Sequence, residues 1–202
     1  MPMRYLWLII FLATLVWSGT HPKDRLTWVL EVLPALIGFA LLVATRRSFP
    51  LTRLAYVLIL FHCIILMVGG HYTYAEVPLF DRIRDWFELE RNNYDKVGHF
   101  AQGFVPAIIA REILLRKAIV AGRAWLVFII VCVCLAISAF YELIEWWVAV
   151  FSEEAAEAFL GTQGYAWDTQ SDMMYALVGA IAALVLLSRI HDRQMDRVAR
   201  GE

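Results

Sequence analysis

The sequence predicts an all-α membrane protein, a bundle of about six transmembrane helices, on three observations. Of the 202 residues, 61% are hydrophobic and only 18% are charged, whereas a typical soluble domain is about half apolar and about a quarter charged. The apolar residues form six runs bounded by charges, and each approaches the ~20 residues that cross a bilayer. The basic residues are distributed unevenly between the two sides. Six spans leave no room for a separate soluble domain, so residues 1–202 are expected to form a single membrane domain.

Six spans follow from these runs in chain order. They cover about residues 5–19, 26–45, 54–70, 97–115, 124–150 and 173–188. The first is short enough to suggest a signal peptide after Arg4. However, the sequence Trp17-Ser18-Gly19-Thr20 lacks a small-x-small cleavage pattern, and we therefore treat the run as a span. Between the third and fourth spans, residues 80–87 predict a short amphipathic helix that lies on the membrane.

Lys and Arg indicate the orientation of the bundle. If the N-terminus is cytoplasmic, the segments on that side hold 12 of the 18 basic residues, and the outer segments hold the other 6. Cytoplasmic loops of membrane proteins carry an excess of Lys and Arg. We therefore expect both termini to lie in the cytoplasm.

Several functional classes are disfavoured. A net charge of -1 gives no reason to expect nucleic acid as a partner. The three cysteines, Cys63, Cys132 and Cys134, lie inside predicted spans and are expected to be apolar filler rather than disulfides. The chain also lacks the HExxH, GxSxG and GxxxxGK[ST] motifs of zinc proteases, serine hydrolases and P-loop proteins.

Ionisable residues in the predicted spans are the strongest functional signal, because such residues are costly in a membrane and usually face the bundle interior. Three sets share an i, i+4, i+7 spacing, which places each set on one helix face. The sets are Asp95, His99 and Gln102; Ser138, Glu142 and Glu145; and Asp168, Asp172 and Tyr175. Glu142 lies 18 residues past Ala124, ~27 Å from the inner face. The three faces are therefore expected to converge near the outer side.

An imidazole and several carboxylates in one place predict a divalent-cation or proton site. The predicted metal ligands are His99, Asp95, Asp168 and Asp172, a set that suits Mn, Mg, Ca or, with the histidine, Zn. Glu142 and Glu145 are the candidate catalytic residues, one of them as general base. Two carboxylates on one face repel each other, so in a low dielectric at least one must be protonated, bound to metal or paired with a cation.

Each of these residues also has an ordinary explanation. Asp95 and Asp168 suit the positive N-termini of their helices, and His99 alone is typical of a hydrogen-bonded interior histidine. An ion pair with Lys96 or with an arginine of the outer loop can neutralise the two glutamates.

Residues near the site provide candidates for substrate binding. They are His71, Tyr72, Tyr74, Glu76, Lys96 and Gln102. The first four follow the third span on the outer side, where an interfacial aromatic anchor is an equally good explanation. Glu31, three residues before Pro34, is expected near the outer end of the second span and needs no functional role. Arg111 and Glu112 lie near the inner end of the fourth span, where they are expected to snorkel or to pair.

Four stretches of the chain form a recognisable set of motifs. They are His71-Tyr72-Thr73-Tyr74, Asn93-Tyr94-Asp95-Lys96-Val97-Gly98-His99-Phe100, Tyr141-Glu142-Leu143-Ile144-Glu145-Trp146-Trp147 and Trp167-Asp168-Thr169-Gln170-Ser171-Asp172-Met173. With these motifs the chain resembles the YjdF-type bacterial inner-membrane proteins. The resemblance runs over nearly the whole chain and implies a multi-pass protein of the inner membrane, in a family without an established activity.

A more distant similarity rests on Asp95-Lys96-x-x-His99, Glu142-x-x-Glu145 and the later Asp168 and Asp172. In these motifs the chain is similar to the VanZ-like membrane proteins. VanZ-like chains tend to have Gln where Glu145 stands and Asn where Asp172 stands. The similarity implies a shared helical framework and a link to the cell envelope.

Three functional hypotheses follow. The leading one is a metal-dependent membrane protein, surrounded by the lipid bilayer, that acts on or binds a lipid-linked or phosphate-bearing molecule of the cell envelope. The alternatives are a small proton- or cation-coupled transporter and a structural or regulatory membrane partner without catalysis. Between Val127 and Ile137 the fifth span offers no polar group beyond two cysteines, which favours a site open on one side only.

Overall fold

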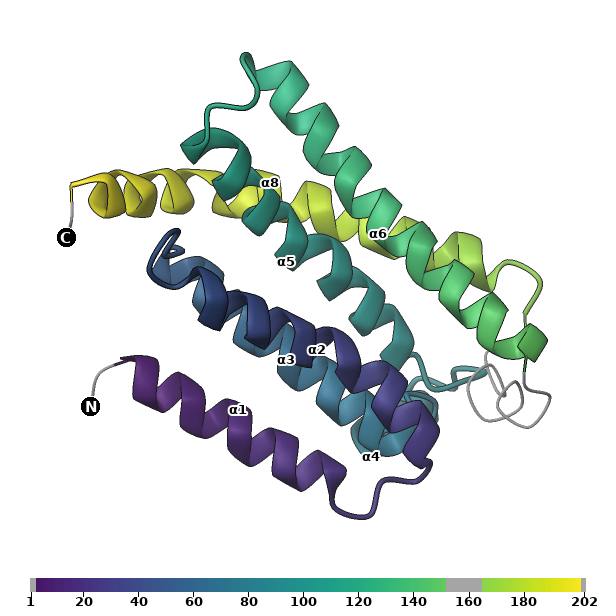
Figure 1. The fold of residues 1–202 in the computed structure, drawn as a ribbon. Coiled ribbons are helices and arrows are strands. Elements are labelled where there is room, and N and C mark those ends of the chain that lie inside the picture. Colours follow the sequence, from purple (N-terminus) through teal and green to yellow (C-terminus); the bar gives the residue numbers. More distant parts are fainter. Residues whose placement is uncertain (1–2, 152–164, 201–202) are drawn as a thin grey trace.

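The structure, a computed structural model, describes residues 3–151 and 165–200, and this part of the chain forms seven helices and no strand (Figure 1). The helices are α1 (Met3–Gly19), α2 (Arg25–Thr45), α3 (Arg53–Tyr72), α4 (Pro78–Trp86), α5 (Tyr94–Arg116), α6 (Arg123–Phe151) and α8 (Asp168–Ala199). The predicted all-α class is confirmed. Helix α8 extends 11 residues past the predicted end at Ser188, because residues 189–199 contain neither Gly nor Pro and are rich in helix-forming Arg, Gln and Met.

Four helices are long and apolar enough to cross a membrane. They are α2, α3, α6 over Arg123–Val148, and α8. Helix α1 is apolar but has only 17 residues, and α5 carries charged residues near both of its ends. The large apolar side chains on the outside of these helices, such as Leu41 and Val185, suit a lipid environment.

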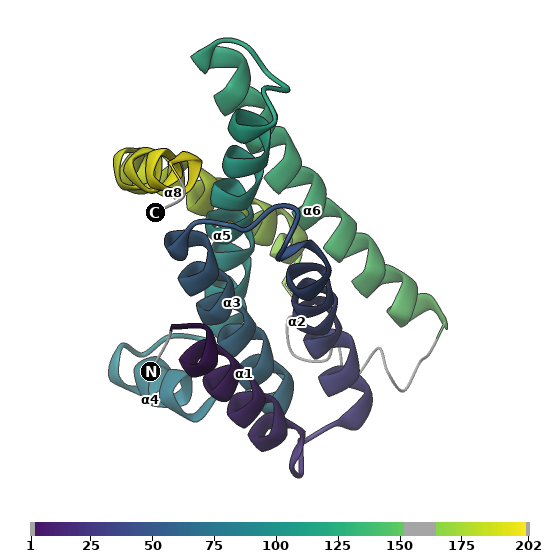
Figure 2. The same ribbon diagram turned by 60° about the vertical axis from the view of Figure 1, so that its left-hand side comes forward.

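Helix α5 lies at the centre of the bundle, in contact with α3, α6 and α8 (Figures 1 and 2). Its most extensive contact is with α8, where two glycines let the backbones meet. A Cβ atom at Gly103 would lie 1.8 Å from the carbonyl oxygen of Ala176, and one at Gly179 would lie 2.1 Å from that of Phe100. Small residues of this kind are typical of close helix crossings in membranes. On its other side α5 contacts α3, which packs against both α1 and α2.

Three apolar clusters of the described residues hold these helices together. One joins α1, α2 and α3 through Trp7, Phe11, Val32 and Met67, a second joins α5, α6 and α8, and a third lies around Tyr74 and Tyr94. The short helix predicted at residues 80–87 is confirmed as α4, Pro78–Trp86. Trp86 and the following Phe87 are 74% and 71% exposed, which suits a helix lying at a membrane interface.

Side-chain caps and an unusual turn define the helix ends near the site. Asp24 caps α2 by accepting a hydrogen bond of 2.7 Å from the backbone N–H of Thr27, and this bond holds the pKa of the Asp24 carboxyl below its ordinary value. At the end of α3, Thr73 and Tyr74 both have a φ of 57°. This left-handed turn folds the Tyr74 ring back against α3 and α5, where a Cβ atom at Gly69 or Gly98 would collide with it.

We call the end of the bundle where α5 and α8 begin the site end, and the opposite end the far end. The C-termini of α1, α3 and α6 also lie at the site end (Figure 1). The backbone N–H of Lys23 donates to the carbonyl of His71 there, which ties the loop between α1 and α2 to the end of α3.

Candidate functional site

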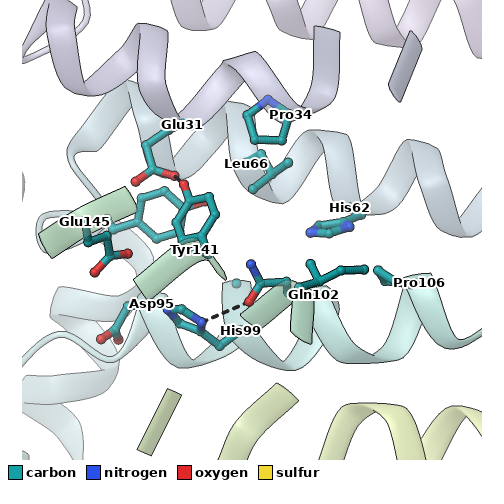
Figure 3. A pocket seen from close by; sticks show the side chains of 13 residues that line it. Glu31, Pro34, His62, Leu66, Asp95, His99, Gln102, Pro106, Tyr141 and Glu145 are labelled. Carbon is teal, nitrogen blue, oxygen red and sulfur yellow. Dashed lines mark hydrogen bonds between the residues drawn. The ribbon is translucent and has the colours of Figure 1, made fainter. Parts of the chain in front are cut away.

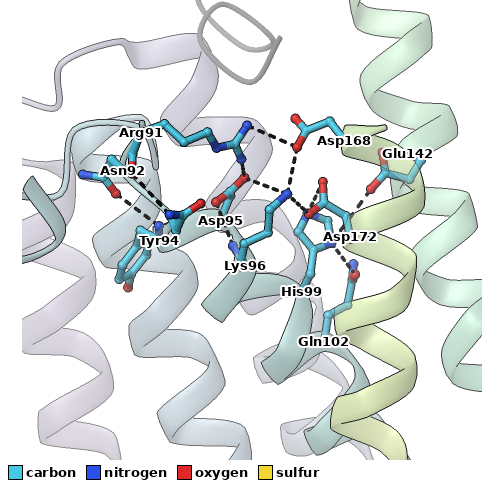
Figure 4. Close-up of polar contacts among 11 residues, drawn as sticks. Arg91, Asn92, Tyr94, Asp95, Lys96, His99, Gln102, Glu142, Asp168 and Asp172 are labelled. Atoms are coloured by element: carbon cyan, nitrogen blue, oxygen red, sulfur yellow. Dashed lines mark hydrogen bonds and ion pairs between the residues drawn. The ribbon is translucent and has the colours of Figure 1, made fainter. Parts of the chain in front are cut away.

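Polar residues of α5, α6 and α8 meet at the site end (Figure 4). Helices α5 and α8 both begin there, whereas α6 approaches from the far end, so Glu142 and Glu145 reach the same level from the last turns of α6. Asn92 fixes the start of α5: its Oδ1 accepts from the backbone N–H of Tyr94, and its Nδ2 donates to the carbonyl of Val77.

The first part of the site is an aspartate group, Asp95, Asp168 and Asp172, which surrounds Lys96. The Lys96 Nζ lies 2.7 Å from Oδ1 of Asp172, 2.8 Å from Oδ1 of Asp168 and 3.5 Å from Oδ2 of Asp95. Arg91 pairs with Asp95 and lies 3.2 Å from Asp168. Two cations therefore neutralise most of the charge on three carboxylates. Arg91 was not singled out among the arginines of the outer loop, although its i, i+4 spacing from Asp95 was a usable signal.

The second part is a His–Glu group, His99, Glu142 and Glu145. One ligand atom from each residue lies within 4.8 Å of the others, and all three side chains are buried. The His99 Nδ1 lies 3.2 Å from Oε1 of Gln102 and 3.9 Å from Oε1 of Glu142. His99 Nε2 lies 3.6 Å from Oδ2 of Asp172, which connects the two groups.

The two glutamates are less well compensated than the aspartates. Oε1 of Glu142 is buried and accepts no hydrogen bond from the described residues. Within the same part of the chain, neither Glu142 nor Glu145 forms an ion pair with a Lys or Arg side chain. Lys96, the expected structural partner of the glutamates, instead pairs with the aspartates. The buried glutamates therefore still require protons or a bound cation.

A pocket of about 240 Å³ borders the His–Glu group, between α2, α3, α5 and α6 (Figure 3). Asp95, His99, Gln102 and Glu145 line it near the aspartate group, and Tyr74 lines it from the turn after α3. Pro34 on α2 and Ile137 on α6 also line the pocket and are both exposed. The pocket therefore reaches the molecular surface between these two helices.

Three further pocket residues were not among the predicted site residues, and one of them, Glu31, was expected to need no functional role. The hydroxyl of Tyr141 donates a hydrogen bond of 2.6 Å to Oε2 of Glu31, across the pocket from α6 to α2. His62 on α3 also lines it (Figure 3). Glu31 and His62 are ionisable residues inside apolar helices, a signal that could have identified His62 and that favoured a role for Glu31.

The predicted substrate-binding residues are divided among several places. Tyr74 and Gln102 line the pocket, and Lys96 belongs to the aspartate group. His71 lies against α1, with its Nδ1 2.9 Å from the carbonyl oxygen of Ser18 and its ring 4.7 Å from that of Trp17. Tyr72 packs on the same tryptophan, and the exposed Glu76 pairs with Lys23. The left-handed turn at residues 73 and 74 separates these side chains from Tyr74.

Comparisons with known proteins place the chain in a family. Residues 3–193 match a family described as "Predicted membrane protein (DUF2238)". Inner membrane protein YjdF of Escherichia coli (strain K12) is 55% identical over 183 residues, which cover 91% of this chain and 88% of that protein. No solved structure matches the chain. The predicted YjdF-type resemblance and the predicted location in the inner membrane are thereby confirmed. The chain is a multi-pass inner-membrane protein that belongs to the DUF2238 family.

Proposed function

We propose that this protein holds a divalent cation at His99, Glu142 and Glu145 and uses it to bind or act on a lipid-linked or phosphate-bearing molecule of the cell envelope. One observation carries the proposal: three buried ligand atoms lie within 4.8 Å, and one glutamate oxygen beside them has no hydrogen-bond partner. An uncompensated buried charge costs several kcal/mol. A divalent cation removes this cost, and a site of one imidazole and two carboxylates suits Zn or Mn.

The neighbouring aspartate group has a different role in this proposal. Asp95, Asp168 and Asp172 hold Lys96 and Arg91 in place rather than binding the metal themselves. The site then combines a Lewis acid with two basic side chains, and phosphate oxygens bind both. A carboxylate oxygen of Glu142 or Glu145 that does not contact the cation can serve as the general base.

The same proposal includes six spans, with both termini in the cytoplasm and the site end on the outer side. Helix α1, with 17 residues, is about 26 Å long, and α5, with 23 residues, is about 35 Å long. Both lengths are close to the ~30 Å of a hydrocarbon core. The excess of Lys and Arg in the segments at the far end supports this orientation.

An apolar layer on the far side of the site supports a site open on one side rather than a transport pathway. Residues of α5, α6 and α8 form this layer, among them Ala107, Ile108, Ile130 and Ala180, which are fully buried. A coupled transporter needs polar groups that continue toward the other face of the membrane.

Elemental analysis of the purified protein tests the proposal. After incubation with divalent ions and gentle removal of the excess, the unchanged protein is expected to retain about one equivalent of metal. The double variant Glu142→Gln/Glu145→Gln is expected to retain none, because the amides keep the shape of the side chains but lose their charge. Glu76→Gln, an exposed glutamate at the same end, is the matched control. Metal-free protein under these conditions would overturn the proposal.

A further inference from the structure

The geometry points to an ammonium-binding subsite in the pocket, formed by Glu31, Tyr74 and Tyr141, and hence to a ligand that carries an amine next to its phosphate. The ligand class is an aminoalkyl phosphate, of which the phosphoethanolamine headgroup is the simplest example. The inference rests on the proposed function only for the phosphate end of this ligand. The amine end is argued from the pocket alone.

The charges of the pocket favour a cationic group. Glu31, Asp95 and Glu145 line it, whereas its lining contains no Lys or Arg. Asp95 is paired with Arg91, but no Lys or Arg of the described residues pairs with the other two. Glu31 is only 8% exposed, and the phenol of Tyr141 is a neutral partner for it. A buried carboxylate without a basic partner is costly, and a ligand ammonium group would supply that partner.

Aromatic rings next to Glu31 fit the same group. Tyr141 reaches Glu31 from α6, and Tyr74 comes from the turn after α3. Gly69 and Gly98 leave room for the Tyr74 ring, because any side chain at either position would collide with it. Cations bind over the faces of tyrosine rings in addition to carboxylates. A fixed ring beside a buried acid is therefore well suited to an ammonium group.

Two prolines and a histidine add hydrogen-bond acceptors in or near the pocket. Pro34 and Pro106 both line it, and because proline has no N–H, the helix carbonyls of Leu30 and Gln102 lose their usual donors. His62 faces the pocket and makes no hydrogen bond or ion pair with the residues that the structure describes (Figure 3). An alkylammonium group carries three N–H donors, so it can bind carboxylate, carbonyl and imidazole acceptors that a phosphate cannot.

Glu145 connects the two ends of the ligand. It lines the pocket and also belongs to the His–Glu group. An amine at Glu31 therefore lies in the same pocket as the proposed cation, which would bind the phosphate. Because the pocket reaches the surface between Pro34 and Ile137, the headgroup of a lipid could enter sideways while its chains stay in the bilayer.

Ligand binding to the detergent-purified, metal-loaded protein tests this inference, for example by calorimetry. Phosphoethanolamine is expected to bind about tenfold more tightly than glycerol phosphate, the order expected for one charge-assisted hydrogen bond. Glu31→Gln is expected to abolish this preference while leaving metal content and affinity for glycerol phosphate unchanged. Tyr141→Phe is expected to weaken it less, and Glu76→Gln, the matched control, to leave it intact.

The outcomes separate this inference from the proposed function. Equal binding of the two phosphates by metal-loaded, unchanged protein would overturn the ammonium subsite and leave the metal site standing, without relying on any variant. If the protein holds no metal, the proposed function fails, but binding of ethanolamine that Glu31→Gln removes would still support the subsite. In nanodiscs, stabilisation by phosphatidylethanolamine but not by phosphatidylglycerol would assign the headgroup to a lipid. Stabilisation by the soluble compound alone would assign it to a free metabolite.

Discussion

Two buried polar networks lie at opposite ends of the α5–α8 pair, and they differ in how fully their acids are satisfied. At the far end, Glu112 is fully buried and accepts four hydrogen bonds. They come from the Thr52 backbone N–H at 2.9 Å, the Thr52 hydroxyl at 2.7 Å, Arg116 at 2.7 Å and His191 at 3.0 Å. Arg111 donates to Nδ1 of His191, which leaves the Nε2–H of that ring to donate to Glu112.

The site end has the opposite character. Glu142 has a buried oxygen without a hydrogen-bond partner, and its neighbours in the His–Glu group are a histidine and a second carboxylate, with no Lys or Arg among them. Buried polar groups in folded proteins are almost always satisfied, and a fully satisfied network stabilises one structure. We infer that the hydrogen bonds of the far-end network stabilise the packing of the ends of α3, α5 and α8. The unsatisfied carboxylate at the site end lowers stability but leaves ligand atoms free to bind a cation.

Removal of Glu112 should have the largest effect on stability. The variant Glu112→Ala leaves His191, Arg116 and the Thr52 N–H without their shared acceptor, and breaking a buried charged pair costs about 3–5 kcal/mol. Thermal unfolding in detergent is expected to show a loss of this order, while Glu76→Ala, an exposed acid, changes little. A loss below about 1 kcal/mol would contradict the stabilising role of the network.

The close crossing of α5 and α8 between the two networks should be the next most sensitive feature. Gly103→Ala places a methyl group against the backbone of Ala176, and overpacking of this kind costs about 1–3 kcal/mol. Gly38→Ala is the matched control, because a Cβ atom there meets no atom within 4 Å. The comparison can be measured by thermal unfolding of both variants. Equal stability of the two would show that the glycine at the crossing is not required.

Glu142→Gln at the site end should change the stability in the opposite direction to Glu112→Ala at the far end, or not at all. Because this residue carries an unsatisfied buried oxygen, loss of its charge is expected to leave the metal-free protein unchanged or more stable by about 1 kcal/mol. The same change is expected to abolish metal-induced stabilisation, measured as the difference in melting temperature with and without divalent ions. A destabilisation as large as that of Glu112→Ala would show that Glu142 is a structural residue.

The helical periodicity of the sequence predicted which residues share a face, but not which partners they choose. The acids and the histidine of the i, i+4, i+7 sets on α5, α6 and α8 do meet at one level, because helix geometry fixes each face and the charges at the helix ends fix its depth. Tyr175, the last member of the α8 set, is instead exposed. Whether Lys96 pairs with the aspartates or with the glutamates depends on distances between helices, and local sequence periodicity does not predict these distances. The pairing of Glu112 with His191 spans 79 residues and could not be predicted for the same reason.

Local backbone geometry explains why the predicted loop after the third span differs from the structure. The sequence placed His71, Tyr72 and Tyr74 in one loop, but α3 continues to Tyr72 and then turns through two left-handed residues. His71 and Tyr72 therefore follow the helix face toward α1, while Tyr74 turns back into the pocket. Non-glycine residues rarely adopt this conformation, and no sequence pattern predicted it here.

Loss of the Asp24 cap should have the smallest effect on stability. It tests whether a hydrogen-bonded acid also stabilises the fold outside the two networks. Asp24 caps α2 at the site end, and its pKa lies below the ordinary value of 3.8 because of the Thr27 N–H bond. A lowered pKa in the folded state means that the cap contributes fully above pH 3.8 and is lost as the pH falls below it. Asp24→Ala is expected to cost about 1 kcal/mol at pH 7, and this difference from the unchanged protein should shrink as unfolding is followed down to acidic pH.

Asp24→Asn keeps a capping side chain without a titrating group, so it should retain most of the stability at pH 7 and lack this acid dependence. A difference for Asp24→Ala that does not shrink in acid would mean that the charge of Asp24 does not contribute to its cap.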